Sequence, residues 1–270
     1  MTNATMAPSA SNWHRFYEKE FWGGYSDPRA KDYFIINSRW TLFAILALHW
    51  YLLNRTLPRW VRERKVINLR PILIVLNGLQ FGAYGCGILV IGYVINYGLE
   101  AWQCEALPRH EFKDEVFLRV GYALFCLRLL ELTTPLIMVM REKPSQKPLM
   151  QTLYSYFYLF LVYHAMNRYT KEIMYMYPLA DGVKIALRSA YYGLRSPGTA
   201  LGQFRQFKKF VLYVSCALSM LCACHSACMI RDNCAAPKAL MAGFFVLSFG
   251  ETIFYFNRII ATHYEKLKDN

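Results

Sequence analysis

Long apolar runs recur along the whole chain and constrain its fold more than any other feature. A helix rises about 1.5 Å per residue, so roughly 20 apolar residues cross the hydrocarbon core of a bilayer. We therefore predict an all-α polytopic membrane protein with seven transmembrane helices joined by short loops. The predicted spans are 34–53, 71–95, 116–140, 149–166, 174–192, 210–230 and 239–260, of which 174–192 is the most polar.

The chain is basic as well as apolar. Its 31 Lys and Arg against 18 Asp and Glu give a net charge of +13, while 55% of the residues are hydrophobic and the mean hydropathy is +0.16. A soluble nucleic-acid-binding protein would share the charge but not the apolar content. The composition therefore favours a membrane protein, with lipids rather than nucleic acid as partners.

The basic residues gather in the loops after the first, third and fifth predicted spans and in the C-terminal tail. Such residues mark cytosolic loops, so we expect a lumenal N-terminus and a cytosolic C-terminus. This divides the chain into a lumenal segment at 1–33, a transmembrane domain at 34–260 and a cytosolic tail at 261–270. The residues are Arg55, Arg59, Arg62, Arg64, Lys65, Arg70, Arg141, Lys143, Lys147, Arg195, Arg205, Lys208, Lys209, Arg258, Lys266 and Lys268.

Several charged residues fall inside the predicted spans, where charge is costly and often functional. Arg128 and Glu131 are three positions apart, as are Asp181 and Lys184, so each pair shares a helical face and can neutralise itself. Two readings remain open: structural ion pairs that face the bundle interior, or residues of a water-lined pocket. The other charged residues inside spans are Arg39, Arg119, Arg188 and Glu251.

Cysteines suggest two further features. Cys222, Cys224, His225 and Cys228 have the spacing of metal ligands, but they lie within an apolar span, where Cys packs as a small hydrophobe, and we expect no metal site. Cys104 and Cys234 fall in predicted lumenal loops, where oxidation is permitted. We therefore expect a disulfide between the loops that contain them.

Two motifs stand out in the predicted spans: Arg128-x-x-Glu131 followed by Arg141-x-Lys143, and Tyr191-Tyr192-Gly193. The first is similar to the third-span signature, and the second to the end of the fifth span, of the ELO fatty-acid elongases of the endoplasmic reticulum, a family that the chain resembles. The remaining matching segments are Asp27-Pro28-Arg29, Asn68 to Asn77, Gln203 to Phe207 with its Gln206, and the dilysine-type tail Lys266-x-Lys268-x-x.

The resemblance implies a bundle around a lipid tunnel and a very-long-chain 3-ketoacyl-CoA synthase, an acyltransferase that condenses acyl-CoA with malonyl-CoA. It also implies a histidine box, H-x-x-H-H, and one later histidine. Counted without gaps, these positions hold Gln151, Tyr154, Ser155 and Ile185. Imidazole, whose pKa lies near 6.5, suits acyl and proton transfer, whereas none of these side chains titrates near neutrality.

His164 is the remaining candidate for a catalytic base. It lies nine residues beyond Ser155, about 13 Å along a helix, which is too far to replace the box in the same register. We therefore expect a pseudoenzyme with a lipid-binding or structural role. The alternatives are an active elongase that uses His164 or Tyr154 and Ser155, and a structural subunit of a larger membrane complex.

The resemblance also assigns possible acyl-CoA or lipid contacts, and we expect no other cofactor. Possible partners are membrane lipids, fatty acyl-CoA and other elongase or membrane-protein subunits. The N-terminal segment lacks a signal-peptide core and is too acidic for a mitochondrial presequence, so we expect the endoplasmic reticulum membrane, with the mitochondrial inner membrane as alternative. The assigned contacts are Arg128, Glu131, Arg141, Lys143, Tyr191, Tyr192, Gln203 and Gln206.

Overall fold

A computed structural model of the chain describes residues 28–62, 69–94, 96–104, 111–140, 149–168, 172–195, 205–232, 234 and 237–268. The described residues contain α-helices and short 3-10 or π-helical turns, and no strand. Every predicted span coincides with helical structure. The main helices are α2 (Phe34–Asn37), α3 (Arg39–Tyr51), α4 (Leu57–Arg62), α5 (Arg70–Val94), α6 (Glu111–Glu131), α7 (Thr133–Met140), α8 (Leu149–Arg168), α9 (Met176–Arg195), α10 (Arg205–Arg231) and α11 (Lys238–Lys268).

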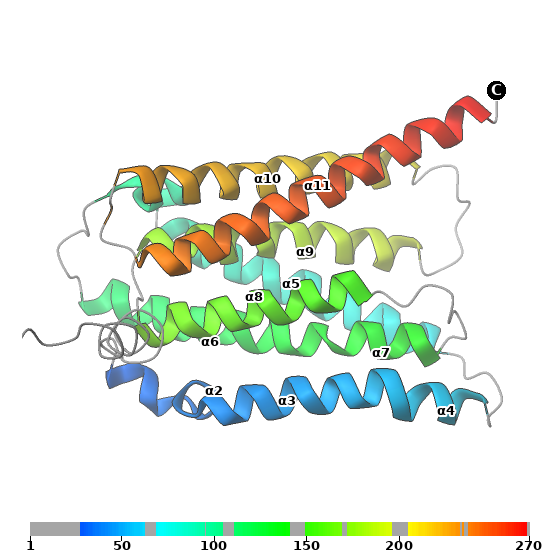
Figure 1. The fold of residues 1–270 in the computed structure, drawn as a ribbon, viewed down its shortest axis with the longest axis horizontal. Helices are drawn as coiled ribbons and strands as arrows, with labels where there is room; N and C mark the ends of the chain where they lie inside the picture. Colours follow the sequence, from blue (N-terminus) through cyan, green and yellow to red (C-terminus); the bar gives the residue numbers. More distant parts are fainter. Residues whose placement is uncertain are drawn as a thin grey trace, which may run out of the picture.

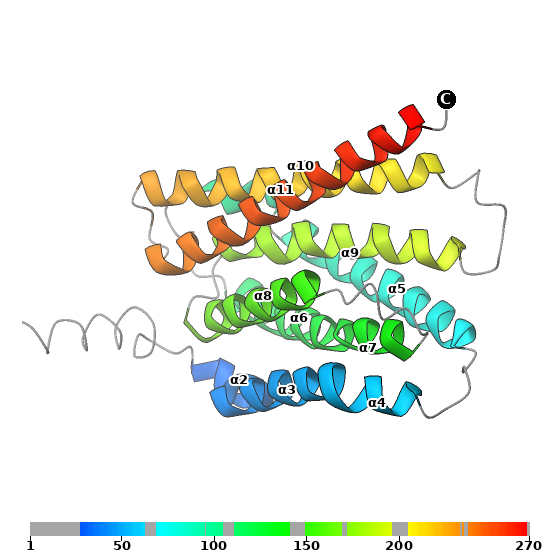
Figure 2. The same cartoon turned by 45° about the vertical axis from the view of Figure 1, so that its right-hand side comes forward.

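The helices lie roughly side by side along the long axis of the molecule (Figure 1). Helix α9 packs between α5 and α10, and α11 packs against α10 and α8. The run from α2 to α4 forms the edge farthest from α10, as the turned view also shows (Figure 2). This arrangement gives α9 a buried position, although it is the predicted span with the most polar sequence.

Prolines account for two irregularities in the helices. A π-helical turn at Leu52–Thr56 precedes Pro58 of α4, and a break at Leu132 separates α6 from α7 shortly before Pro135. Proline has no N–H, so the carbonyl four residues earlier loses its partner and the helix bends or unwinds there. Pro71 lies in the first turn of α5, where the missing N–H costs little.

Two glycines allow helices to approach closely. A Cβ atom on Gly87 of α5 would lie 2.7 Å from Cδ2 of Leu124 on α6, and one on Gly243 of α11 would lie 2.6 Å from Cδ2 of Leu161 on α8. Small residues at such contacts let helices pack where lipid supplies no hydrophobic drive for association. Gly87 thus allows α5 to approach α6, and Gly243 allows α11 to approach α8.

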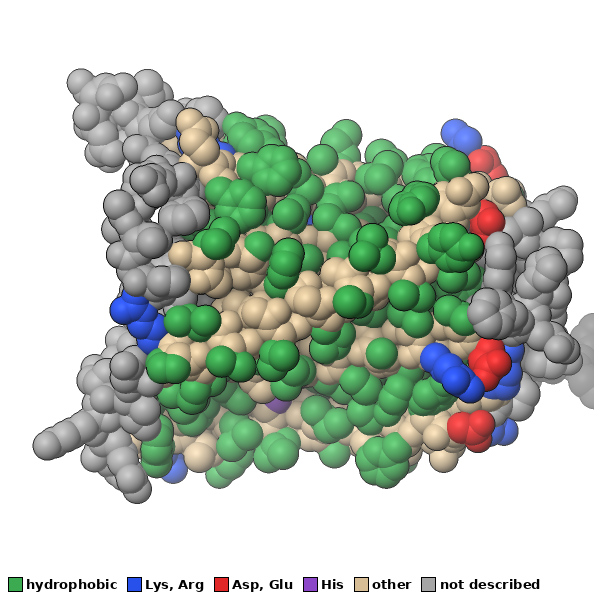
Figure 3. Space-filling view, turned by 180° about the vertical axis from the view of Figure 1, so that it is seen from behind, with side chains coloured by type: hydrophobic (Ala, Val, Ile, Leu, Met, Phe, Trp, Pro, Cys, Tyr) green, Lys and Arg blue, Asp and Glu red, His purple; other side chains and the backbone are tan. Residues whose placement is uncertain are grey.

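Among the residues that the structure describes, three helices are long and apolar enough to cross a membrane: Arg70–Val94, Gln206–Arg231 and Lys238–Thr262. On the face that Figure 3 shows, hydrophobic side chains largely cover the surface between the two ends of the bundle, and most charged side chains in view lie at the ends. Large apolar residues such as Trp40, Leu79 and Val246 are well exposed. An apolar surface of this extent faces lipid rather than water. The protein is therefore a helical membrane protein.

Candidate functional site

Six charged side chains form a continuous row of ion pairs inside the bundle. The helical spacing of three or four residues places the contributions of α6 and of α9 on one face of each helix. We call this set the ion row. Its members, in spatial order, are Arg188, Glu131, Arg128, Asp181, Lys184 and Glu251.

One half of the ion row joins α6 to α9. Nη2 of Arg188 lies 2.9 Å from Oε1 of Glu131, and Glu131 also pairs with Arg128 one helical turn away on α6. Nε of Arg128 lies 3.5 Å from Oδ2 of Asp181 on α9. Glu131 and Asp181 thus hold the guanidinium of Arg128 between them.

The other half joins α9 to α11. Nζ of Lys184 lies 3.7 Å from Oδ1 of Asp181 and forms an ion pair with Glu251 of α11. Oε2 of Glu251 also accepts a hydrogen bond from the Ser219 hydroxyl of α10 at 2.8 Å. Positive and negative groups therefore alternate along the ion row, and its formal charges cancel.

Four of the six members of the ion row are buried, whereas the side chain of Arg188, at one end of the row, is 26% exposed. Arg128, Asp181, Lys184 and Glu251 are between 4% and 8% exposed as residues. An isolated charge at such a site costs several kcal/mol, and only close partners with good geometry offset that cost. The structure therefore matches the reading of interior ion pairs for Arg128 with Glu131 and for Asp181 with Lys184, and extends both into one network.

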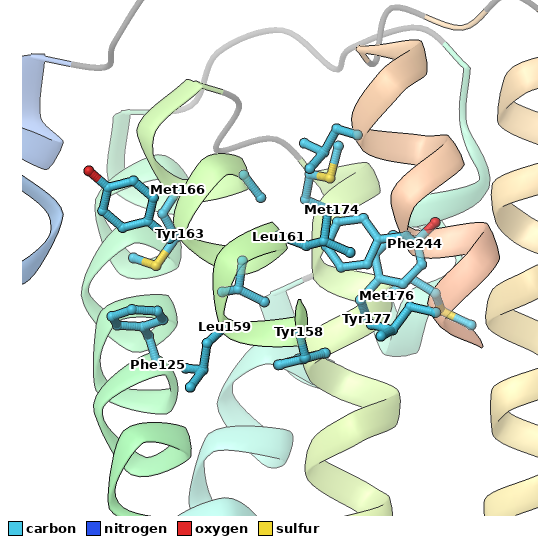
Figure 4. Close-up of a cluster of buried hydrophobic side chains, with 14 of the residues drawn as sticks. Phe125, Tyr158, Leu159, Leu161, Tyr163, Met166, Met174, Met176, Tyr177 and Phe244 are labelled. Carbon is cyan, nitrogen blue, oxygen red and sulfur yellow. The ribbon is translucent and has the colours of Figure 1, made fainter. Parts of the chain in front are cut away.

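A mainly apolar cavity, partly open to the outside, adjoins the ion row. It extends from Arg128 and Asp181 toward the end of the bundle that carries Met166 and Met174, about 12 Å along α8. Figure 4 shows the surrounding cluster of buried side chains. The lining residues are Tyr84, Gly121, Leu124, Phe125, Arg128, Tyr158, Val162, Ala165, Met166, Met174, Tyr175, Pro178, Asp181 and Phe244.

Tyr84 contributes a third polar group at the ion-row end of the cavity. The side chain comes from α5, and the residue is only 2% exposed. Its hydroxyl has no hydrogen-bond partner among the described residues. Buried hydroxyls usually have a partner, since an unmade hydrogen bond costs about 1–3 kcal/mol. The cavity thus combines an apolar body with a polar end that can still donate a hydrogen bond.

The positions corresponding to the histidine box do not form an acid–base centre. Gln151 is exposed on α8 and Ile185 is buried in the core near Tyr84. Tyr154 places its ring 6.0 Å from the guanidinium carbon of Arg128, and Ser155 is half-buried. Tyr154 is therefore the one box position that contacts the ion row.

His164 lies on α8 outside the lining of the cavity. Its ring packs edge-on against Phe160, with 4.4 Å between the ring centroids, and it also contacts Tyr163. A general base must come within hydrogen-bond reach of the atom it deprotonates. In this arrangement His164 does not face the polar end of the cavity.

Two other histidines tie helices together. Nε2 of His49 donates to the Leu132 carbonyl at 2.7 Å, where α6 breaks, and its Nδ1 pairs with the Tyr156 hydroxyl. Nε2 of His225 donates to the Ala101 carbonyl at 2.8 Å, and its Nδ1 lies 3.0 Å from the Tyr177 hydroxyl. Both ring nitrogens of each imidazole are thus committed to structural hydrogen bonds.

The remaining predicted contact residues are dispersed. Arg141, Lys143 and Gln203 lie outside the described residues. Tyr191 is buried near Phe207, whereas Tyr192 and Gln206 are exposed, and none of the three lines the cavity. The structure brings Arg128 and Glu131 together, and it does not bring these three residues to them.

A disulfide joins Cys104, which follows the turn Glu100–Trp102, to Cys234 between α10 and α11. Close to it, Nε of Arg231 donates a 2.7 Å hydrogen bond to the Asp232 carboxylate, and this bond lowers the pKa of Asp232 below its ordinary value. The disulfide links the connection after α5 to the turn between the last two helices. We call this end of the bundle the disulfide end.

Sequence reasoning missed two features of the site. Tyr84 carries no signal, because a tyrosine in an apolar span resembles any other core aromatic. Glu251 was recognisable as a charge inside a span, but its partner Lys184 is 67 residues away in the chain. Only the packing of α9 against α10 and α11 brings the two together.

Comparison with known proteins supplies the last observation. A search among curated proteins finds no match. The comparison with protein families matches residues 34–270 to the family described as ELO, GNS1/SUR4. The matched segment includes the described helices α2 to α11, the ion row and the cavity. The chain therefore belongs to the ELO (GNS1/SUR4) family, a family related to fatty-acid elongation.

Proposed function

We propose that this ELO protein has lost the condensing reaction and holds a lipid in the cavity beside the ion row. The observation that carries the proposal is the absence of an imidazole at the polar end, where the described lining offers Tyr84, Arg128 and Asp181. Condensation requires a group that takes up or activates the acyl thioester and a base that moves protons near neutral pH. Arg128 and Asp181 are ion-paired, and tyrosine titrates far above neutrality.

The cavity supports the lipid-binding part of the proposal. Apolar side chains dominate its lining, as they do in small-molecule sites, and a few polar groups lie at one end. Acyl-CoA, which the resemblance to the elongases implies as a ligand, is a second candidate. Arg128 would then have to leave Glu131 or Asp181 to meet a phosphate, so this role of Arg128 is a prediction that requires the ion row to open.

An elongation assay tests the loss of chemistry. The purified protein in lipid nanodiscs, given palmitoyl-CoA and labelled malonyl-CoA, is expected to release no 3-ketoacyl product above the protein-free background. An active ELO elongase prepared in the same way is the positive control. A malonyl-dependent product that disappears in His164→Ala, or in Tyr154→Phe, would establish the alternative of a working elongase with non-standard residues.

The topology and location form a second part of the proposal. We infer seven spans, a lumenal N-terminus, a cytosolic C-terminus and residence in the endoplasmic reticulum membrane, which is typical of the family. The placement of basic residues supports the orientation, and the Lys266-x-Lys268-x-x tail supports retention. A role as a structural subunit in another membrane, including the mitochondrial inner membrane, is the competing assignment.

The tail provides the test of location. Lys266→Ala combined with Lys268→Ala is expected to move most of the protein from the endoplasmic reticulum to later secretory membranes, because both basic groups of the signal are removed. Fluorescence microscopy of the tagged full chain measures the shift, and Lys238→Ala, far from the tail, is the control. Unchanged reticular staining of the double variant would remove the dilysine argument, and mitochondrial staining of the parent would remove the location itself.

A further inference from the structure

The charge balance at the polar end of the cavity restricts the kind of lipid that can occupy it. Three cations and three carboxylates alternate along the ion row, and each pairs with at least one opposite charge. No cation of the ion row is left over for an incoming anion. A carboxylate or phosphate entering the cavity would therefore be an uncompensated charge in a buried site, which is strongly disfavoured.

Two lining groups have no hydrogen-bond partner among the described residues, the Tyr84 hydroxyl and Nε of Arg128, but the charge of Arg128 is already paired with Glu131 and Asp181, so the neutral donor is Tyr84. The Tyr84 hydroxyl lines the cavity, is 2% exposed and has no hydrogen-bond partner among the described residues. A neutral oxygen, such as a hydroxyl, ester or ketone oxygen, can accept its proton without bringing charge into the site. Arg128 and Asp181 lie at the same end of the cavity. Because they form an ion pair, together they contribute a dipole and no net charge.

The rest of the cavity has the apolar lining that an alkyl chain requires. From Tyr158 toward Met166 on α8, and from Asp181 toward Met174 near the start of α9, the remaining lining side chains are apolar or aromatic. Phe125 of α6 and Phe244 of α11 belong to this lining, and Figure 4 shows both side chains. A chain that starts at Tyr84 would therefore extend toward the disulfide end.

We propose that the cavity selects uncharged lipids, with a hydroxyl or carbonyl oxygen held by Tyr84 and an alkyl tail running toward Met166 and Met174. This inference rests on the proposed lipid-binding function and narrows its ligand to a neutral polar end. It covers fatty alcohols and neutral acylglycerols alike, because they present the same oxygen on the same kind of tail.

Two probes with identical tails and different ends test the selection. Dodecan-1-ol and dodecanoate, labelled and compared at pH 8 where the acid is ionised, are titrated into the full-length protein in detergent. We expect dodecan-1-ol to bind more than about tenfold tighter, because only the acid adds an unpaired buried charge. Equal or tighter binding of dodecanoate would overturn the neutral selection and leave lipid binding intact. Binding of neither probe would overturn both.

Substitutions locate the contact. Tyr84→Phe should weaken dodecan-1-ol binding by about two- to tenfold, the value of one hydrogen bond, while Tyr93→Phe on the exposed face of the same helix should leave binding unchanged.

Asp181→Asn removes one negative charge from the ion row and should improve dodecanoate binding relative to the alcohol. If Tyr84→Phe binds like the parent, or if Asp181→Asn keeps the parent's preference, the proposed contact or the charge argument is wrong. The comparison of the two probes on the parent protein decides the selection even if a variant does not fold.

Discussion

Replacing Glu251 with alanine is expected to destabilise the bundle by about 3–5 kcal/mol, because it leaves a buried cation without its close partner. Lys184 is 4% exposed, and its remaining carboxylate, Asp181, is 3.7 Å away and shared with Arg128. Ser219 also loses the acceptor of its hydrogen bond. The loss should lower the melting temperature by roughly 10 °C. Thermal denaturation followed by size-exclusion chromatography in detergent measures it.

Two comparisons separate charge from packing. The double variant Lys184→Met with Glu251→Leu removes both charges and keeps the net charge of the ion row at zero, so it should be far more stable than Glu251→Ala. Glu115→Ala breaks the ion pair with Arg119, whose side chain is 71% exposed, and should cost less than about 1 kcal/mol. If the double variant is as unstable as Glu251→Ala, uncompensated charge is not the cause.

Removing the disulfide is expected to have an effect of similar size. Cys104 and Cys234 are 130 residues apart, so the bond closes a long loop in the unfolded chain. Loop-closure estimates for such a length give about 5 kcal/mol, and Cys104→Ser should therefore melt well below the parent under non-reducing conditions. The same thermal denaturation experiment provides the measurement.

Reductant and a second cysteine provide the controls for this experiment. Dithiothreitol should lower the melting temperature of the parent toward that of Cys104→Ser and leave the variant itself unchanged. Cys86→Ala, which replaces an exposed free cysteine on α5, should melt like the parent in both conditions. A Cys104→Ser variant that melts with the non-reduced parent would show that the bond contributes no stability.

The helices could be predicted because their signal is local. Apolar runs of about 20 residues depend only on neighbouring residues, and each predicted run coincides with helical structure. The break at Leu132 and the π-helical turn at Leu52–Thr56 were not predicted, although Pro135 and Pro58 follow them. A proline in an apolar run shows that a hydrogen bond is lost, but its tertiary surroundings decide how the helix adjusts.

The site was predictable only in pieces. Arg128 with Glu131, and Asp181 with Lys184, follow from spacing within one helix. The links between the pairs, such as Lys184 to Glu251, depend on how α6, α9 and α11 pack, and no spacing rule gives that contact. The cavity is also a product of packing, since its lining comes from α5, α6, α8, α9 and α11.

The ion row also bears on how the chain enters the membrane. On insertion scales, Asp, Lys and Arg each disfavour a central position in a lone helix by roughly 2.5–3.5 kcal/mol. Helix α9 carries Asp181, Lys184 and Arg188, and the partner of Lys184 is synthesised 67 residues later. In the proposed seven-span arrangement, α9 is therefore expected to insert poorly by itself. Its charges are fully paired only after α11 has been made, so we expect stable insertion of α9 to require the C-terminal helix.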